Sequence, residues 1–176
     1  MPTLVALLRG INLAKRRRVA MSDLRALLEE AGYEDVRTHL QSGNVVLRTR
    51  QQPQTAARKI EQAIEAALGL DVDVLVRTAA ELAEVVAADP FAGVADDGSR
   101  YFVLFLDEPP PKAALDALAA EDFAPDAFAA GNREVYVWCP EGLRDSRLMK
   151  ALGKELRLQG TVRNWNTVTK LAELSR

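Results

Sequence analysis

The feature that most constrains the fold is the stretch Ala6-Leu7-Leu8-Arg9-Gly10-Ile11-Asn12, in which an apolar, strand-like run ends in a polar turn. Gln41-Ser42-Gly43-Asn44 interrupts a second such run in the same way. A weaker echo, Ala130-Gly131-Asn132, follows in the second half of the chain, and Val162-Arg163-Asn164-Trp165-Asn166 answers Val76-Arg77-Thr78. The pattern predicts a duplicated α+β unit whose polar groups gather at turns.

Hydrophobic periodicity around these turns indicates strands alternating with helices in the first half. We expect strands over residues 3–8, 36–40, 45–48 and 72–76, and helices with the apolar stripes Leu24, Leu27, Leu28, Ala31 and Ala57, Ile60, Ile64, Leu68. Ser22 offers an N-cap oxygen to the first helix, and Gly32 suits the position after its end. Thr78 to Glu81 has capping-box form and predicts a further helix through Val86.

The second half repeats this order, with strands expected over residues 101–106, 134–138 and 161–164 and helices from Ala113, over 147–158 and over 168–174. Strand-helix-strand-strand-helix-strand is the ferredoxin-like plan. We therefore predict an α+β chain of two tandem ferredoxin-like (βαββαβ) subdomains, residues 1–90 and 91–176, each an antiparallel sheet with helices on one face. The join at 88–98 is short and partly apolar, so we expect the subdomains to pack together as one unit.

Composition places the chain in the cytoplasm and away from membranes. The 176 residues, 48% of them hydrophobic, suffice for one substantial core or two small ones. No apolar run reaches the roughly 18 residues that span a bilayer, and no basic segment precedes the first apolar run as in a secretory signal. Cys139 is the single cysteine, so no internal disulfide forms, as is usual in the cytosol.

The charges are unevenly distributed along the chain, whose formal net charge is −2. Residues 89–142 carry an excess of Asp and Glu, whereas residues 143–176 carry an excess of Lys and Arg. A second basic cluster joins Arg9 with the run Lys15-Arg16-Arg17-Arg18. The overall balance does not favour nucleic acid, but two local segments do.

The first candidate site is the meeting of two turns in the ferredoxin-like plan, which places the end of the first strand beside the turn between strands two and three. It comprises Arg9, Gly10, Asn12, Gln41, Ser42, Gly43 and Asn44. The amides, the hydroxyl, the Arg charge and a nearby helix start could together hold a phosphate or carboxylate. Alternatively, these residues simply build turns and satisfy the main chain.

Two basic segments are further candidates. The run Lys15 to Arg18 could contact phosphates, or it could be a solvated loop. The second segment has basic residues at helical spacing opposite an apolar face, namely Arg147, Lys150, Lys154 and Arg157. The pattern predicts an amphipathic helix, which could lie against a polyanion or simply show its polar face to water.

The last candidate is Arg163-Asn164-Trp165-Asn166 at a strand-to-helix junction. Trp165 could stack on a base or ring while the amides recognise its edge. Alternatively, Trp165 fills the space between the halves, and Asn166 or Thr167 caps the last helix. Neither reading is favoured by the sequence.

Signals for catalysis, metals or cofactors are poor. The single His39 lies in a predicted strand and excludes a two-His zinc site. Cys139 has no basic neighbour to lower its pKa, so we do not expect a reactive thiol. Neither a phosphate-binding P-loop nor a dinucleotide-binding glycine motif is present, and we predict no cofactor.

The chain resembles the bacterial family of unknown function DUF1697 over nearly its whole length. The likeness rests on four motifs: residues 4–12, 21–25, 41–46 and 163–168. It implies two tandem ferredoxin-like subdomains and no particular activity. One departure is Leu13-Ala14, which stands where family members usually carry Gly-Gly.

The leading hypothesis is a cytosolic protein that binds an anionic ligand, a nucleotide or nucleic acid, at the Arg/Asn/Gly turns. An alternative is an enzyme acting on a small phosphorylated or carboxylated metabolite, with Arg9 and Arg163 orienting the substrate and Asn44 stabilising developing charge. A further alternative is a protein-partner module that uses a sheet edge or a helix face.

Overall fold

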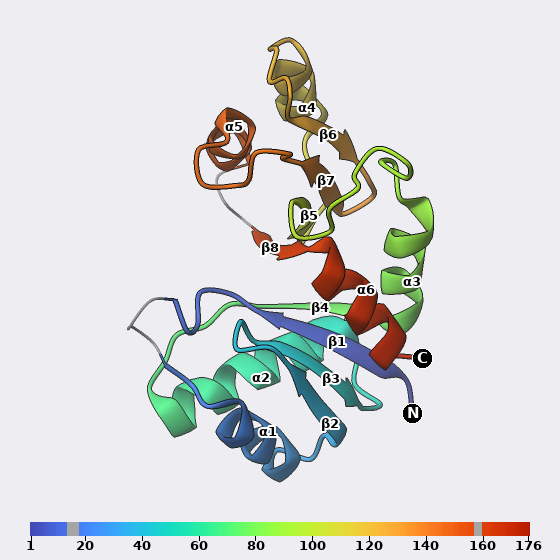
Figure 1. Cartoon of the computed structure of the whole chain (residues 1–176). Coiled ribbons are helices and arrows are strands. Elements are labelled where there is room, and N and C mark those ends of the chain that lie inside the picture. Colours follow the sequence, from blue (N-terminus) through green and yellow to red (C-terminus); the bar gives the residue numbers. More distant parts are fainter. Residues whose placement is uncertain (14–17, 157–159) are drawn as a thin grey trace. The chain divides into compact units, whose positions relative to one another are not determined.

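The chain divides into two compact units in a computed structural model that describes residues 1–13, 18–156 and 160–176 (Figure 1). The first unit comprises Met1–Glu84 with Lys170–Arg176, and the second comprises Val85–Thr169. The two boundaries therefore fall within α3 (Ala79–Ala88) and α6 (Trp165–Leu174).

The first unit is a four-stranded antiparallel sheet with strand order β2-β3-β1-β4. Its elements before α3 are β1 (Thr3–Leu8), α1 (Met21–Glu30), β2 (Glu34–His39), β3 (Asn44–Arg48), α2 (Pro53–Leu68) and β4 (Val74–Thr78). The central position of β1 explains why its run of residues is almost uniformly apolar, since both of its faces are buried.

The core of the first unit lies between one face of this sheet and the helices α1 and α2. Leu4, Ala6 and Leu8 alternate along β1 and pack with Leu24 and Leu28 of α1 and with the apolar stripe of α2. The period of two in the strand and of three to four in the helices brings these side chains to the same layer. Both helices therefore cover the same face of the sheet.

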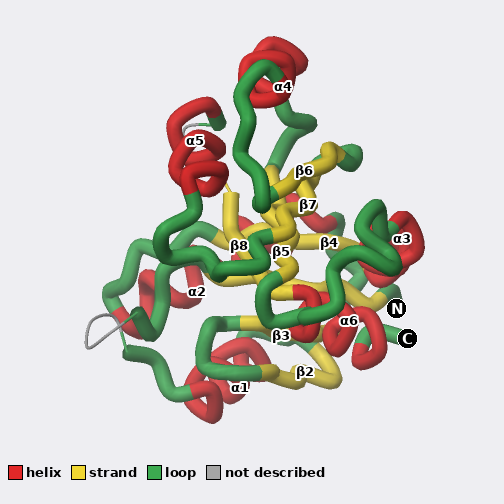
Figure 2. Tube along the Cα trace, turned by 45° about the horizontal axis from the view of Figure 1, so that its top comes forward, coloured by secondary structure: helices red, strands yellow, loops and turns green. Residues whose placement is uncertain are grey.

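The second unit repeats this arrangement with strand order β6-β7-β5-β8, again antiparallel throughout (Figure 2). Its elements are β5 (Tyr101–Leu106), α4 (Lys112–Ala119), β6 (Ala127–Ala130), β7 (Glu134–Trp138), α5 (Arg147–Glu155) and β8 (Gly160–Asn164). Phe102, Leu104 and Leu106 of β5 pack against α4 and α5, as the alternate residues of β1 do in the first unit.

The predicted α+β class is confirmed, with two four-stranded antiparallel sheets and six helices in the described part of the chain. The capping box is confirmed as well, because the Glu81 carboxylate accepts from the Thr78 N–H (2.8 Å) and the Thr78 hydroxyl accepts from the Glu81 N–H (3.1 Å). None of the helices over the described residues is long and apolar enough to cross a membrane.

The predicted cap at Ser22 is wrong. Helix α1 begins at Met21, two residues earlier than a cap at Ser22 requires, so Ala20 is the N-cap and Ser22 lies within the first turn. Ala has no side-chain oxygen, and no described side chain supplies a capping hydrogen bond there. The first-turn N–H groups of α1 therefore receive no capping hydrogen bond from a described side chain.

Gly43 in the β2–β3 turn has a positive φ of 82° and lies against β1. The Leu8 N–H donates to the Gly43 carbonyl (2.9 Å). A Cβ added at Gly43 would lie 2.7 Å from Ile11 Cδ1 and 2.8 Å from Leu8 Cβ. Only glycine satisfies both the backbone conformation and this close approach.

We expect Gly43→Ala to lower the free energy of unfolding by about 3 kcal/mol, because it combines left-handed strain with overpacking. Gly32→Ala is the matched control, since Gly32 also has a positive φ (90°) but nothing lies within 4 Å of its added Cβ. Its loss should be only about 1 kcal/mol. Urea unfolding of both variants measures the difference, and equal losses would contradict the packing argument.

Candidate functional site

The side chain of Asn12 connects three segments of the first unit. Its Nδ2 donates to the carbonyls of Val19 (2.9 Å) and Gln41 (2.6 Å), and its Oδ1 accepts from the Val19 N–H (2.7 Å). Asn12 has a positive φ of 53°, which asparagine tolerates better than most residues. The loop after β1, the segment before α1 and the β2–β3 turn are thus held together by one amide.

The amide of Asn44 closes the β2–β3 turn from within. Asn44 is fully buried, and its Nδ2 donates to the His39 carbonyl (2.8 Å) and to the Ser42 hydroxyl (2.9 Å). Ser42 and Gln41 are exposed at the tip of the same turn. Asn12 and Asn44 therefore have the turn-building role that the sequence left open beside ligand contact.

Arg9, at the end of β1, is bound to Asp73, the residue before β4. Its N–H donates to the Asp73 carbonyl (2.9 Å), and its guanidinium is 3.7 Å from the Asp73 carboxylate. The Arg9 and Asp73 side chains are 40% and 73% exposed, so this ion pair contributes between about 0 and 1 kcal/mol. Gly10 follows with a positive φ of 69°, which lets the chain leave the strand.

A cavity of about 430 Å³ lies beside the start of α1. It is lined by Asn12, Arg18, Val19, Ala20 and Gln41. The uncapped first turn of α1 adjoins it through Ala20, and Arg18 is exposed. A cation and a helix N-terminus at the same cavity attract a negative charge.

Sequence reasoning identified only part of this cavity. It named Asn12 and Gln41, and it named Arg18 within the basic run, but it missed Val19 and Ala20. The other members of that run, Lys15, Arg16 and Arg17, lie outside the described residues. The sequence signal for this part of the cavity is Ala20 at the N-cap position, because alanine leaves the helix start without a side-chain cap. The nearby Ser22, a common capping residue, led to the wrong cap being predicted.

Arg163 belongs to the second unit and is buried, with only 8% of its surface exposed. Its Nη1 donates to the Thr161 hydroxyl (2.6 Å) and to the Val162 carbonyl (2.9 Å). Burial lowers the pKa of the guanidinium to about 10. The side chain therefore lies within the fold of this unit, on β8.

Asn164 caps α6, because its Oδ1 accepts from the Thr167 N–H (2.9 Å). The expectation that Asn166 or Thr167 is the cap is therefore wrong. Strand β8 runs directly into the helix, so the last strand residue takes the N-cap position. The exposed Asn166 instead lies against Gly98, where an added Cβ would be only 2.2 Å from its Oδ1.

Trp165 packs in an aromatic cluster of the second unit. Its ring stacks on Tyr101 at 4.6 Å between centroids and lies 6.4 Å from Tyr136. The Tyr101 hydroxyl donates to Asp89 Oδ1 (2.9 Å), and the Tyr136 hydroxyl donates to the Val85 carbonyl (2.7 Å). Burial is the main cause that raises the pKa of both phenols.

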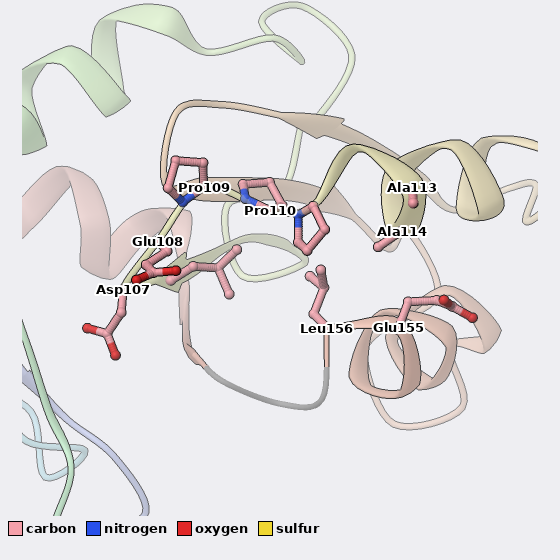
Figure 3. A pocket seen from close by; sticks show the side chains of 10 residues that line it. Asp107, Glu108, Pro109, Pro110, Ala113, Ala114, Glu155 and Leu156 are labelled. Atoms are coloured by element: carbon pink, nitrogen blue, oxygen red, sulfur yellow. The ribbon is translucent and has the colours of Figure 1, made fainter.

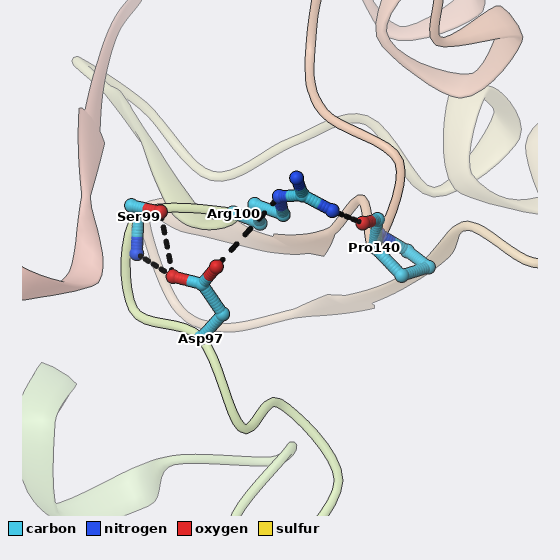
Figure 4. A network of polar contacts seen from close by, with 4 residues as sticks. All are labelled: Asp97, Ser99, Arg100 and Pro140. Atoms are coloured by element: carbon cyan, nitrogen blue, oxygen red, sulfur yellow. Dashed lines mark hydrogen bonds and ion pairs between the residues drawn. The ribbon is translucent and has the colours of Figure 1, made fainter.

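The loop that carries Gly98 is held by a polar network (Figure 4). Asp97 Oδ1 accepts from the Ser99 N–H (2.9 Å) and hydroxyl (2.6 Å), and these bonds lower the pKa of the Asp97 carboxyl. Arg100 lies 3.7 Å from the same carboxylate and donates to the Pro140 carbonyl. The network fixes the loop beside Asn166. The polar groups of this loop therefore have a structural role.

A second cavity, of about 680 Å³, lies in the second unit between the end of β5 and the end of α5 (Figure 3). Its carboxylates are Asp107, Glu108 and Glu155, and its apolar walls include Pro110 and Leu156. The local negative charge makes this cavity unsuitable for an anion.

Thiol and metal chemistry find little support in the structure. Cys139 is fully buried, its Sγ lies 3.5 Å from the Ser146 hydroxyl, and burial raises the pKa of its thiol. His39 lies in β2, within a strand as predicted. Across residues 1–13, 18–156 and 160–176, no group of three His, Cys, Asp or Glu side chains could hold a metal ion.

The chain belongs to the family described as Protein of unknown function (DUF1697), which matches residues 1–136. The membership expected from the motifs is therefore confirmed. A conserved bacterial protein from Streptococcus pneumoniae has a similar solved structure, with a TM-score of 0.81, 19% sequence identity and 99% of each chain covered. At this identity the likeness shows the fold alone. The chain matches no functionally curated protein.

Replacing Asn12 by glycine tests its role in holding the three segments. Asn12→Gly keeps the positive φ accessible but removes three hydrogen bonds, so we expect unfolding to become easier by about 2 kcal/mol. Leu40→Gly is the control, since Leu40 also has a positive φ (59°) and is exposed. It should be neutral or stabilising. Urea midpoints that fall equally for both variants would refute the bracing role.

The aromatic cluster predicts a loss of stability in alkali. A phenol whose pKa is raised by folding contributes stability that is complete below about pH 10, the ordinary tyrosine value, and is lost above it. The free energy of unfolding should therefore fall from about pH 10 upward. In Tyr101→Phe that fall should be shallower by up to about 1.4 kcal/mol per pH unit. Urea unfolding between pH 8 and 11 measures both slopes, and identical slopes would disprove the assignment.

Proposed function

For this member of the DUF1697 family, we propose that the first unit binds a small anionic ligand, a nucleotide, at the cavity beside the start of α1. The observation that carries the proposal is the coincidence of Arg18, the exposed Gln41 amide and the uncapped first turn of α1 at one cavity. A volume of about 430 Å³ lies within the range of small-molecule sites, roughly 300–1,000 Å³.

The first-turn N–H groups of α1 supply directional donors and a partial positive charge. Arg18 supplies a full charge and a planar fork suited to phosphate oxygens. Asn12 contributes indirectly, because its hydrogen bonds hold Val19 and Gln41 at the edges of the cavity. Asp23 in the first turn opposes an anion, and the net attraction depends on Arg18 and the amides.

Binding is proposed rather than catalysis because of what lines the cavity. Its described lining residues, Asn12, Arg18, Val19, Ala20 and Gln41, include no general base and no nucleophile. The segment Arg163 to Asn166 lies in the second unit and is used there for capping, stacking and loop packing. The proposed site therefore involves the first unit alone. We propose that the protein is cytoplasmic.

We further propose that the chain consists of two tandem ferredoxin-like subdomains, residues 1–90 and 91–176, produced by duplication. The strand orders β2-β3-β1-β4 and β6-β7-β5-β8 support this proposal. Arg77 is paired with Val5 and Arg163 with Val103, and both arginines are buried. The next residue, Thr78 or Asn164, then caps the following helix.

Ala20→Asp provides the sharpest test of the anion site. A carboxylate at the N-cap would occupy the first-turn amides and add negative charge, so the variant should be as stable as the wild type or more so, by up to about 1 kcal/mol. At the same time it should abolish binding of ATP or AMP in calorimetric titration. Arg18→Gln should weaken that binding by about 10-fold or more, the value of one charge-assisted hydrogen bond.

Asp23→Asn is the matched control, because it removes a charge of the opposite sign from the same turn. Its affinity for the nucleotide should equal or exceed that of the wild type. Failure of the wild type to bind ATP, AMP or inorganic phosphate at low salt would end the proposal, and so would binding that Ala20→Asp leaves intact.

A further inference from the structure

Helix α5 carries a row of basic side chains on its outer face. Arg147, Lys150 and Lys154 are all exposed. Leu148 and Leu152 are completely buried in the core of the second unit. At 100° per residue the two sets point roughly in opposite directions, so the buried leucines fix the basic row toward solvent. The fourth predicted member, Arg157, lies outside the described residues.

The charges of this row are not neutralised by carboxylates. Among the described residues, neither Lys150 nor Lys154 has an ion-pair partner, whereas Lys112 pairs with Asp116 (2.7 Å) and Lys170 with Glu173 (3.1 Å). Arg147 lies over the Phe123 ring at 5.7 Å, a contact that leaves its charge intact. The row therefore keeps its positive potential.

The carboxylate of α5 is directed elsewhere. Glu155 lines the second cavity, on the side opposite Asp107 and Glu108 (Figure 3). At 100° per residue, Glu155 points to a different flank of α5 from the basic row. The start of α5 is also closed, because the Ser146 hydroxyl accepts from the Met149 N–H (3.0 Å). The positive surface is thus the row of side chains and not the helix terminus.

From this geometry we propose that the outer face of α5 binds the phosphate backbone of a nucleic acid. With a rise of 1.5 Å per residue, the row from Arg147 to Lys154 extends about 10 Å. A duplex presents a phosphate about every 3.4 Å along each strand, so three cations in line match about three phosphates. The contacts involve no base edge, so binding should be independent of sequence.

Other anionic partners fit this face less well. An anionic membrane holds a basic helix through apolar side chains that insert beside the cations, but Leu148 and Leu152 are buried. A small anion needs cations that converge on one point, whereas these are arranged in a line. The basic row belongs to the second unit, whereas the proposed nucleotide site belongs to the first.

The test is fluorescence anisotropy of a labelled 20-base-pair DNA duplex and a labelled 20-nucleotide RNA with the full chain, at salt concentrations from 50 to 200 mM. Three phosphate contacts predict that the association constant for the duplex falls about 40-fold over this range. In Lys150→Gln/Lys154→Gln one contact remains, so the fall should be only about 3- to 4-fold, with weaker binding at 50 mM.

Lys112→Gln/Lys170→Gln is the matched control, because it removes the same net charge from lysines that are already paired. It should retain the steep salt dependence of the wild type. Stronger binding to the duplex than to the RNA is expected, because the row of cations matches the phosphate spacing of a duplex, and binding to the RNA alone would contradict that match.

Three outcomes would overturn it: no binding to either nucleic acid at 50 mM salt, equal losses in the two double variants, or binding only to vesicles containing phosphatidylglycerol. The Ala20→Asp variant keeps this result distinct from that of the nucleotide site. If Ala20→Asp abolishes nucleic acid binding and the α5 variant does not, the surface on α5 is excluded while the first-unit site gains support.

Discussion

The hydrogen bonds of the Asn12 side chain are the constraint on which the candidate site depends. One amide joins the loop after β1 to the segment before α1 and to the β2–β3 turn, which are 7 and 29 residues away along the chain. Asn12 is half-buried, and all of these hydrogen-bond partners are main-chain atoms. The cavity beside α1 follows from that arrangement, because Val19 and Gln41 border it only where Asn12 holds them.

The use of side-chain amides within the fold explains why this site is not simply a cluster of polar side chains available to a ligand. Asn12, Asn44 and Asn164 all use their amides on the protein's own groups, so they shape the surface without presenting themselves to a ligand. What remains available is what the fold does not need, namely the N–H groups of a helix start whose cap is alanine, and the Arg18 charge. Recognition at this edge would therefore be made largely by the main chain.

The two units apply one plan with different chemistry. In each, a buried arginine near the end of the last strand is followed directly by a residue that caps the next helix, Thr78 in one and Asn164 in the other. The first helix of each unit has a different N-cap residue, Ala20 for α1 and Pro111 for α4, and neither makes a side-chain capping hydrogen bond. Among the helices of the described residues, only α5 of the second unit has a strongly basic outer face.

Sequence alone determined the order of strands and helices except for β6 (Ala127–Ala130), which it did not identify as a strand, the antiparallel plan with β1 at its centre, and the amphipathic character of α5. These follow from local periodicity and from Gly and Asn at turns, which act over a few residues. Tertiary structure alone decided that Asn12 braces the main chain, that Ala20 rather than Ser22 is the N-cap of α1, and that Trp165 stacks on Tyr101. Each depends on which distant groups meet, and composition does not reveal whether a polar side chain will find its partner within the fold or in a ligand.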